Sequence, residues 1–383
     1  MSLAGSRFNE GKMRLVDKLA QVNWLFVAGV LLTAGIGFGM LYSAAGGNID
    51  PWASRQMVRF GIGLGVMFAI AFVDIRFWMR WAYAFYFASL LLLGIVEVMG
   101  VTGMGAQRWL SFGPTQIQPS EIMKIALILG LARYFHGRTL EEVTRPIYLI
   151  LPLAMVLVPA ALVLRQPDLG TGVILILAAT TVIFIAGVKL WKFGILFGLA
   201  LGAVPVAWHM LRDYQRARIL TFLDPERDPL GAGYHILQSK IALGSGGVFG
   251  KGFMQGTQSH LNFLPERQTD FIFTMLAEEF GLVGGLGLIL LYMTLVALGF
   301  LTAVRSASQF GRYLALGIIT IFFLYVFINI AMVMGILPVV GVPLPLISYG
   351  GSSMMTLLAG FGFLLNVAVH RDVQISRRGV VPG

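Results

Sequence analysis

The chain contains ten apolar runs of about 20 residues, and this repetition limits its possible folds more than any other feature. A helix needs about 20 apolar residues to cross the hydrocarbon core of a bilayer. Such runs lie near residues 23–44, 56–73, 81–99, 120–136, 147–165, 170–188, 191–211, 280–303, 313–335 and 351–370. The pattern predicts an all-α integral membrane protein with about ten transmembrane helices, because an isolated helix satisfies its own backbone polar groups in lipid. We expect residues 1–383 to form a single polytopic membrane domain.

The composition excludes the soluble classes of protein. Of the 383 residues, 57% are hydrophobic and 12% are charged, whereas soluble chains carry about 25% charged residues. A soluble enzyme, a DNA-binding module and a disordered scaffold are therefore excluded. The net charge of +10 is typical of basic cytoplasmic loops in a membrane chain, so we expect no nucleic-acid partner. The absence of cysteine excludes disulfides, thiolate metal sites and cysteine nucleophiles.

Basic residues predict which way the chain faces. With the N-terminus in the cytoplasm, sixteen lysine and arginine residues fall in cytoplasmic segments, and four fall in the opposite short loops and nearby helix ends. The excess of positive charge on one side therefore places both termini in the cytoplasm. The large hydrophilic segment 212–268, just before the eighth span, then lies on the outer face.

The fourth apolar run contains two ionisable residues that need an explanation, because a charge at the bilayer centre costs roughly 2.5 kcal/mol or more. Glu121 and Lys124 are three residues apart, so they lie on one helix face. The pair could neutralise itself and tie helices together. Alternatively, Lys124 could face an anionic ligand while Glu121 holds it in place. The two interpretations are compatible, since a structural pair can also line a cavity.

A carboxylate stands where the outer segment meets the membrane. Residues 269–303 are too long for one span, so we expect a break near Gly281 and a short helix over 269–280 at the outer surface. Asp270 would then lie in the first turn of that helix, with Thr269 as a possible cap. Asp270 could be no more than part of this helix start. A partly desolvated carboxylate at that depth could also act as a base.

Several outer segments carry candidate ligand groups or broken backbone. Arg216 and Arg218 could grip a phosphate or could simply meet lipid headgroups. The acidic run 224–229 could be a metal loop, but its two prolines favour a turn cluster, so we expect no metal site there. The segments 103–118, 166–171 and 338–353 are irregular, which is tolerated at membrane depth only where backbone is buried in protein or lines a wet cavity.

The motifs at these corners resemble the SEDS family (shape, elongation, division and sporulation). They read QPSE at 118–121 followed by Lys124, QPDLGT at 166–171, and ISYGGSS at 347–353. Three loop motifs are more narrowly similar to the rod-shape-determining branch: DPLGAGYH at 228–235, FLPER at 263–267 and TDFIF at 269–273. The cell-division branch is the nearest alternative. The resemblance extends from the first span to the last.

This resemblance implies a ten-span peptidoglycan glycosyltransferase of the bacterial inner membrane. Such an enzyme polymerises lipid II, adding it to a lipid-linked glycan strand at the periplasmic face. Its implied partners are a class B penicillin-binding protein that crosslinks the strands, the elongation machinery and the surrounding membrane lipids. The family's key carboxylate falls on Asp270. The family's other functional positions fall on Arg108, Glu121, Lys124, Asp168, Gln215 and Ser352.

The residues are compatible with a single inverting displacement. A sugar hydroxyl would attack an anomeric carbon while polyprenyl pyrophosphate leaves, which requires a base and positive charge at the leaving group. We expect Asp270 to be the base, Lys124 and Arg108 to meet the pyrophosphate, and Glu121 to position Lys124. Asp168, Gln215, Arg218 and Ser352 complete the expected substrate contacts. No nucleotide is required, because the donor is already activated, and a divalent cation, Mg or Mn, could share the charge.

Two other functions fit some of these features. A lipid-linked precursor flippase or another transporter would also contain intramembrane charges and broken helices. Against it, the unusual polar groups cluster at one face instead of tracing a route across the membrane. A non-catalytic scaffold for cell-wall enzymes would keep its function after Asp270→Ala.

Overall fold

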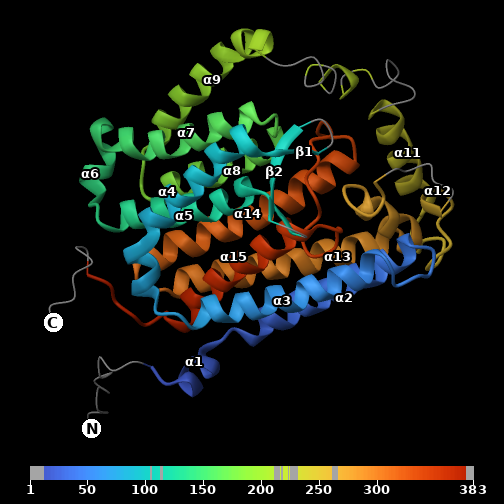
Figure 1. Ribbon diagram of the computed structural model, residues 1–383, viewed down its shortest axis with the longest axis horizontal. Coiled ribbons are helices and arrows are strands. Elements are labelled where there is room, and N and C mark those ends of the chain that lie inside the picture. Colours follow the sequence, from blue (N-terminus) through green and yellow to red (C-terminus); the bar gives the residue numbers. More distant parts are fainter. Residues whose placement is uncertain are drawn as a thin grey trace.

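The computed structural model describes residues 13–103, 106–112, 115–210, 216, 219–222, 224, 232–260 and 266–376. It shows a bundle of long helices that lie side by side (Figure 1). All ten predicted spans coincide with helices: α2 (Trp24–Ala44), α3 (Trp52–Phe72), α4 (Ile75–Met99), α5 (Pro119–His136), α7 (Ile150–Arg165), α8 (Leu169–Ile185), α9 (Leu190–Met210), α13 (Ile272–Arg305), α14 (Gln309–Val333) and α15 (Gly351–Val369).

The length and composition of these helices suit a membrane. In the described part of the chain, seven helices are long and apolar enough to cross a bilayer, and α8 and α9 are shorter apolar helices. The tenth, α5, contains 18 residues and carries the two ionisable groups that the sequence singled out. The all-α, multi-pass membrane fold is therefore confirmed.

Several spans begin earlier than predicted, α3 and α4 among them. Helix α3 starts at Trp52 and α4 at Ile75, whereas the apolar runs start at 56 and 81. The first turns of both helices carry an arginine, Arg55 in α3 and Arg76 in α4, and both residues lie before the apolar runs. A long basic side chain can reach the membrane interface from within a helix, so the helix extends beyond its apolar run.

Shorter elements connect the long helices. They are α1 (Leu15–Gln21), α6 (Leu140–Thr144), the 3-10 helix η1 (Pro146–Leu149), α11 (Ala232–Ser245), α12 (Thr257–His260), and the strands β1 (Val101–Gly103), β2 (Ala106–Phe112) and β3 (Thr115–Ile117). The strands form an antiparallel sheet in the order β1-β2-β3. The segment 103–118, which was predicted to be irregular, is thus largely a small sheet. Apolar cross-strand pairs such as Leu110 opposite Ile117 stabilise it.

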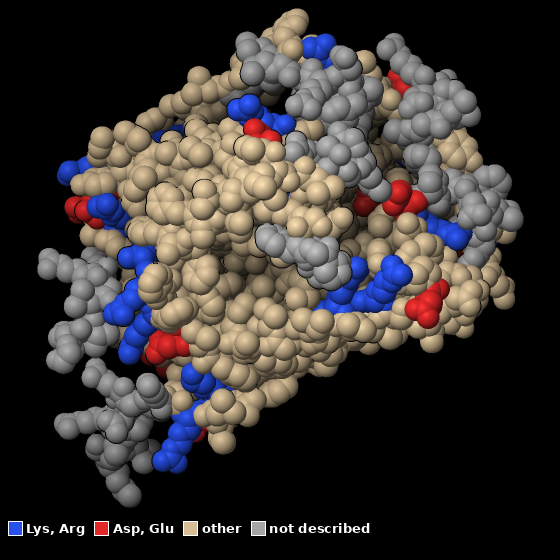
Figure 2. All heavy atoms as spheres, viewed as in Figure 1, with Lys and Arg blue, Asp and Glu red and all other residues tan. Residues whose placement is uncertain are grey.

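The bundle has two distinct ends. The first and last described residues lie at one end, here called the terminal end, and α11 and α12 lie toward the other, here called the loop end (Figure 1). Charged side chains gather toward both ends, with a broad uncharged surface between them (Figure 2). Helix α14 is the most buried of the candidate spans, followed by α15. Helix α9 projects away from the rest of the bundle (Figure 1). Helix α5, most of whose residues are buried, joins α14 and α15 in the interior of the molecule.

Helix α13 is broken where the sequence predicted. Gly281 has φ 67° and ψ −161°, a conformation that only glycine adopts readily. The loop after α11 crosses the break so closely that a Cβ on Gly281 would lie 2.5 Å from the carbonyl oxygen of Val248. The loop also accepts two backbone hydrogen bonds from α13. Leu282 N donates to the carbonyl oxygen of Gly247 (2.9 Å), and Val283 N donates to the carbonyl oxygen of Val248 (3.1 Å). The break therefore serves as a docking point for the loop.

The helix before the break differs from the prediction. It begins at Ile272, its N-cap is Phe271, and no side chain caps it. Asp270 lies in the turn before the helix, and the Thr269 hydroxyl donates to the carbonyl oxygen of Glu266 (3.1 Å) instead of acting as the cap.

This helix is also buried within the protein. Residues 271–279 are all buried, because α11 and its following loop cover them. Lys251 in that loop donates to the fully buried Glu278 (2.8 Å), and Ser43 of α2 donates to Glu279 (2.5 Å). These partners are distant in sequence, so the apolar pattern could not reveal them.

Candidate active site

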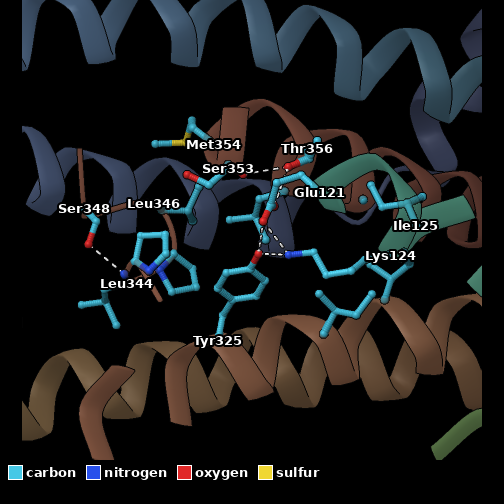
Figure 3. Close-up of a pocket in the computed structure, with 16 residues that line it drawn as sticks. Glu121, Lys124, Ile125, Tyr325, Leu344, Leu346, Ser348, Ser353, Met354 and Thr356 are labelled. Atoms are coloured by element: carbon cyan, nitrogen blue, oxygen red, sulfur yellow. Dashed lines mark hydrogen bonds and ion pairs between the residues drawn. The ribbon is translucent and has the colours of Figure 1, made fainter. Parts of the chain in front are cut away.

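Glu121 and Lys124 form a buried ion pair at the start of α5, as predicted. Lys124 Nζ lies 2.6 Å from Glu121 Oε1, and the side chains are 3% and 8% exposed. Tyr325 of α14 joins the pair: its hydroxyl donates to Glu121 Oε1 (2.7 Å) and accepts from Lys124 (Figure 3). Thr356 of α15 donates to the other carboxylate oxygen (3.1 Å). Three helices therefore meet at one carboxylate.

The ion pair lines a cavity between α5, α14 and α15 (Figure 3). The cavity has an empty volume of about 550 Å³, counting the space at its mouth. Apart from the ion pair, its walls are mainly apolar and include Ile125, Ile318, Met354 and Leu357. The chain between α14 and α15, here called the 334–350 segment, closes one side with Pro343, Leu344, Pro345, Leu346 and Ser348. The site thus combines one buried cation with an apolar chamber.

Lys124 retains capacity to bind an anion. An ammonium group has three donors, and two acceptors, on Glu121 and Tyr325, contact Lys124 Nζ among the described residues. The ammonium also lies 4.3 Å from the Tyr325 ring centroid, where the ring face favours a cation. These contacts allow a charged lysine to remain in a buried position.

A second polar corner lies where α7 gives way to α8. Asp168 is the N-cap of α8, and its Oδ1 accepts from Thr171 N (3.2 Å). Its Oδ2 accepts from Gln118 Nε2 (2.9 Å), just before α5. Arg108 of β2 donates to the carbonyl oxygens of Gln166 (3.0 Å) and Pro167 and lies 4.0 Å from Asp168. The structure therefore brings Arg108 and Asp168 together.

Asp270 lies across the 334–350 segment from this corner. A Cβ on Gly341 would be 3.5 Å from Asp270 Oδ2. Just beside it, a Cβ on Gly170 of α8 would meet Val342 (2.7 Å). The backbone carbonyl of Asp270 accepts from Asn329 Nδ2 of α14 (3.0 Å). Burial also lowers the pKa of the nearby Arg267 guanidinium.

The 334–350 segment is the common neighbour of these groups. Its residues 340–342 lie between Asp270 and the start of α8, and its residues 343–348 line the cavity of the ion pair. Ser348 anchors it by donating to the carbonyl of Thr269 (2.6 Å), and Gln56 of α3 donates to the carbonyl of Ser348 (3.0 Å). Groups that are far apart in sequence therefore meet around one irregular segment.

The predicted residues do not all share one chamber. Asp270, Arg108 and Asp168 are not among the residues that line the cavity of Lys124. Ser352 lies in the first turn of α15, where its carbonyl accepts from Thr356 (2.8 Å), and its neighbour Ser353 lines the cavity. Gln215 and Arg218 lie outside the described residues.

Sequence reasoning missed three residues of the site. Tyr325, Asn329 and Thr356 all contact a residue that the sequence singled out. They are uncharged, and the sequence search considered only ionisable groups inside the spans. Tyr325 and Asn329 are four residues apart, so they lie on one face of α14. Polar residues repeated at helical spacing inside an apolar span could have revealed that face.

Arg59 of α3 is a further basic group beside the site. Its guanidinium lies 5.1 Å from the ring centroid of Tyr349, in the 334–350 segment. Basic side chains over α3 border a hollow in the face shown in Figure 2. In the part of the chain that the structure describes, no three His, Asp or Glu side chains gather into a group that could hold a metal ion.

Comparisons with known proteins show what the chain is similar to. Residues 23–373 match the model of the FtsW/RodA/SpoVE family, which is described as "Cell cycle protein". The chain is 47% identical to peptidoglycan glycosyltransferase MrdB of Escherichia coli K12 over 337 residues, which cover 87% of this chain and 90% of MrdB. It is 36% identical to a solved chain of a peptidoglycan synthase complex that coordinates polymerisation and crosslinking (TM-score 0.80, covering 91% and 98%). It is 32% identical to the rod shape determining protein RodA of Thermus thermophilus (TM-score 0.70, covering 91% and 97%).

Proposed function

Because this chain belongs to the FtsW/RodA/SpoVE family of cell cycle proteins, we propose that it polymerises lipid II into glycan strands during cell elongation. The SEDS resemblance of its motifs is confirmed by that membership. Like its relative MrdB, the chain is a peptidoglycan glycosyltransferase. The observation that carries the proposal is the buried Lys124, held by Glu121 and Tyr325 at the wall of an apolar cavity.

The leaving group is the first requirement of the reaction. When polyprenyl pyrophosphate departs, negative charge develops on the oxygen that leaves the anomeric carbon, and a preorganised cation stabilises it. Lys124 has one ammonium donor beyond its two contacts with Glu121 and Tyr325. Glu121 holds that ammonium in place. The apolar walls around it suit the start of a polyprenyl chain.

Arg108 supplies a second cation. Its guanidinium donates to the carbonyl oxygens of Gln166 and Pro167 and lies 4.0 Å from Asp168. These contacts fix the orientation of the guanidinium before substrate binds. A planar guanidinium can bind phosphate oxygens in pairs. We assign Arg108 to the pyrophosphate as well, and Asp168 to holding Arg108.

Asp270 is the proposed base. Its carboxylate would accept the proton of the attacking sugar hydroxyl as the new C–O bond forms and the bond to pyrophosphate breaks. One such displacement inverts the anomeric configuration. The carboxylate faces Gly341 on one side of the 334–350 segment, and the Lys124 cavity lies against the following residues of that segment. Both groups thus lie beside one segment, and the proposed in-line displacement requires the base and the cation on opposite sides of the anomeric carbon.

A divalent cation, which could share the charge, is not part of this mechanism. The described residues offer no group of three His, Asp or Glu side chains, so we derive no step through Mg or Mn. Gln215, Arg218 and Ser352 remain proposed substrate contacts.

We place this chemistry at the periplasmic face of the bacterial inner membrane, with both termini in the cytoplasm. The partner proposed is a class B penicillin-binding protein, within the elongation machinery. A structural relative that belongs to a synthase complex coordinating polymerisation and crosslinking supports that pairing. The ligands proposed are lipid II, the nascent lipid-linked strand and the surrounding membrane lipids.

The test is glycan-strand synthesis from purified lipid II by the protein reconstituted with its class B partner. Wild type is compared with Asp270→Asn and Asp270→Ala in equal amounts of folded protein. We expect polymer from the wild type and none from either variant, because the carboxylate that accepts the proton is missing. Polymer from the Asp270 variants would refute the assignment of the base. Movement of lipid II between leaflets without polymer would indicate a transporter.

A further inference from the structure

Asn329 is a buried polar residue that the proposed mechanism does not use. It lies on α14 one turn beyond Tyr325, and none of its surface is exposed. A buried amide in the interior of a membrane protein is expected to make specific hydrogen bonds, because an unpaired polar group there is costly. Its contacts therefore indicate what it does.

The amide group of Asn329 joins two backbone segments. Nδ2 donates to the carbonyl oxygen of Asp270 (3.0 Å) and to the carbonyl oxygen of Val342 (2.7 Å). The first carbonyl belongs to the proposed base, and the second belongs to the 334–350 segment. Asn329 thus links α14, the turn before α13 and the segment that separates Asp270 from the start of α8.

The orientation of this amide is determined by its surroundings. An asparagine has two N–H donors, and both face carbonyl oxygens. Its Oδ1 is buried and has no hydrogen-bond partner among the described residues. Exchanging the oxygen and nitrogen would place Oδ1 against two carbonyl oxygens, which repel it. The amide therefore fits only with its nitrogen toward Asp270 and Val342. In this orientation both N–H donors are used, and Oδ1 has no partner among the described residues.

We propose that Asn329 is a positioning residue. It holds the backbone of Asp270 in register with the 334–350 segment and with Tyr325, the partner of the ion pair, which lies one turn away on α14. This inference rests on the proposed role of Asp270 as the base. An aspartate has a short side chain, so the position of its backbone largely decides where its carboxylate lies. A hydrogen bond to its own carbonyl therefore fixes the base directly.

Misplacement of a catalytic group has a large kinetic effect. A shift of about 1 Å can lower the rate roughly 100-fold. Substrate binding depends on many other contacts, so the loss should appear in kcat and not in KM. That division distinguishes a positioning role from a loss of substrate affinity.

The chain contains a matched control. Asn366 of α15 is also fully buried, and its Nδ2 donates to the carbonyls of Ile70 (3.1 Å), Ala71 (3.0 Å) and Val73 (2.5 Å) at the end of α3. Its Oδ1 likewise has no partner among the described residues. It lies near the terminal end of the bundle, away from Asp270. The two asparagines share chemistry and burial but differ in location.

The experiment compares Asn329→Leu with Asn366→Leu. Leucine retains much of the shape of asparagine and removes both donors. Each variant is purified, its thermal midpoint is measured, and kcat and KM for lipid II polymerisation are determined with the class B partner. We expect both variants to lose thermal stability. Only Asn329→Leu should lose kcat, by about 100-fold, with KM within about threefold of wild type.

Other outcomes overturn the proposal. Equal loss of kcat in both variants would mean that a buried asparagine is needed only for folding. Wild-type kcat in Asn329→Leu, or a loss confined to KM, would mean that Asn329 does not position the base. If Asn329→Leu yields no folded protein, Asn329→Ser and Asn366→Ser are compared in the same way. Serine is shorter and has one donor, so it cannot bond both carbonyls, and Asn329→Ser should still lose kcat relative to Asn366→Ser.

Asp270→Asn, assayed alongside, separates this inference from the function on which it rests. If Asp270→Asn polymerises lipid II at the wild-type rate, the assignment of the base fails and the inference fails with it. If Asp270→Asn is inactive while Asn329→Leu is fully active, the base assignment survives and only the role of Asn329 is refuted.

Discussion

The pair of Glu121 and Lys124 indicates function because it is poorly suited to stability alone. Removing two charges from water is costly, and apolar residues of similar volume often stabilise a protein as well or better. This pair nevertheless lies buried, with Tyr325 and Thr356 satisfying further acceptors. Within a membrane span, such a pair is expected where a charge is required for binding or catalysis.

Replacing Lys124 and then Glu121 by uncharged residues should change stability and activity differently. Lys124→Met leaves the Glu121 carboxylate buried without its cation, which should lower the free energy of unfolding by about 3–5 kcal/mol. Adding Glu121→Gln removes the unpaired charge and should restore most of that stability. Polymerisation should remain lost in both variants, because neither supplies a cation to the leaving group. The measurements are the thermal midpoint and lipid II polymerisation.

The double variant provides the decisive result. If Lys124→Met with Glu121→Gln regains both stability and polymerisation, the pair is only a structural tie and the pyrophosphate role of Lys124 is wrong. The isolated Lys124→Met variant cannot decide this, since its instability alone could abolish activity.

At the scale of elements, the break in α13 connects the loop after α11 to Asp270. The buried helix before the break is held at its far end by hydrogen bonds from Lys251 N to Glu278 O and from Gly252 N to Glu279 O (both 3.0 Å). At its start, Asn329 and Ser348 bond the carbonyls of Asp270 and Thr269. A short helix fixed at both ends transmits the position of the loop to the carboxylate.

Replacing the glycine at the break should disrupt this connection. Gly281→Ala places a Cβ against the Val248 carbonyl in a backbone conformation that costs alanine roughly 1–3 kcal/mol, before any clash. We expect a lower thermal midpoint and a loss of polymerisation. Gly287→Ala is the control, because it lies in the same helix with nothing within 4 Å of the added Cβ. That variant should be unchanged or more stable by up to about 1 kcal/mol. Equal behaviour of the two variants would contradict a requirement for the break.

At the scale of the whole molecule, the proposed function requires the loop end to face the periplasm. An even number of spans places both termini on one side, and charged side chains lie toward the two ends of the bundle with an uncharged surface between them (Figures 1 and 2). The excess of basic residues assigned to the terminal side predicts that this side is cytoplasmic.

Single cysteines can test this orientation cleanly, because the chain contains no cysteine of its own. Asn48 is exposed between α2 and α3 at the loop end, and Ala307 is exposed between α13 and α14 at the terminal end. In intact cells, a membrane-impermeant maleimide should label Asn48→Cys and not Ala307→Cys. Both should react after permeabilisation. Labelling of Ala307→Cys alone in intact cells would invert the proposed topology and remove the periplasmic site.

Much of this protein follows from local sequence. The length of each apolar run predicted all ten long helices, because crossing a bilayer fixes how many apolar residues a span needs. The three-residue spacing of Glu121 and Lys124 predicted their pairing, since helical geometry places such residues together. The glycine at 281 predicted the break in α13. The motifs around these residues predicted the family.

The tertiary structure decided which distant groups meet. Burial of the helix after Asp270 depends on α11 and Lys251, and the ion pair depends on Tyr325 and Thr356 from two later helices. The proposed role of Asn329 depends on the carbonyl groups of Asp270 and Val342, which are 59 and 13 residues away in the chain. A periodic pattern shows which face of a helix is apolar, but the contacts of a polar side chain depend on which helices pack together. The sequence therefore determined the spans and the family, whereas packing around the 334–350 segment determined the site.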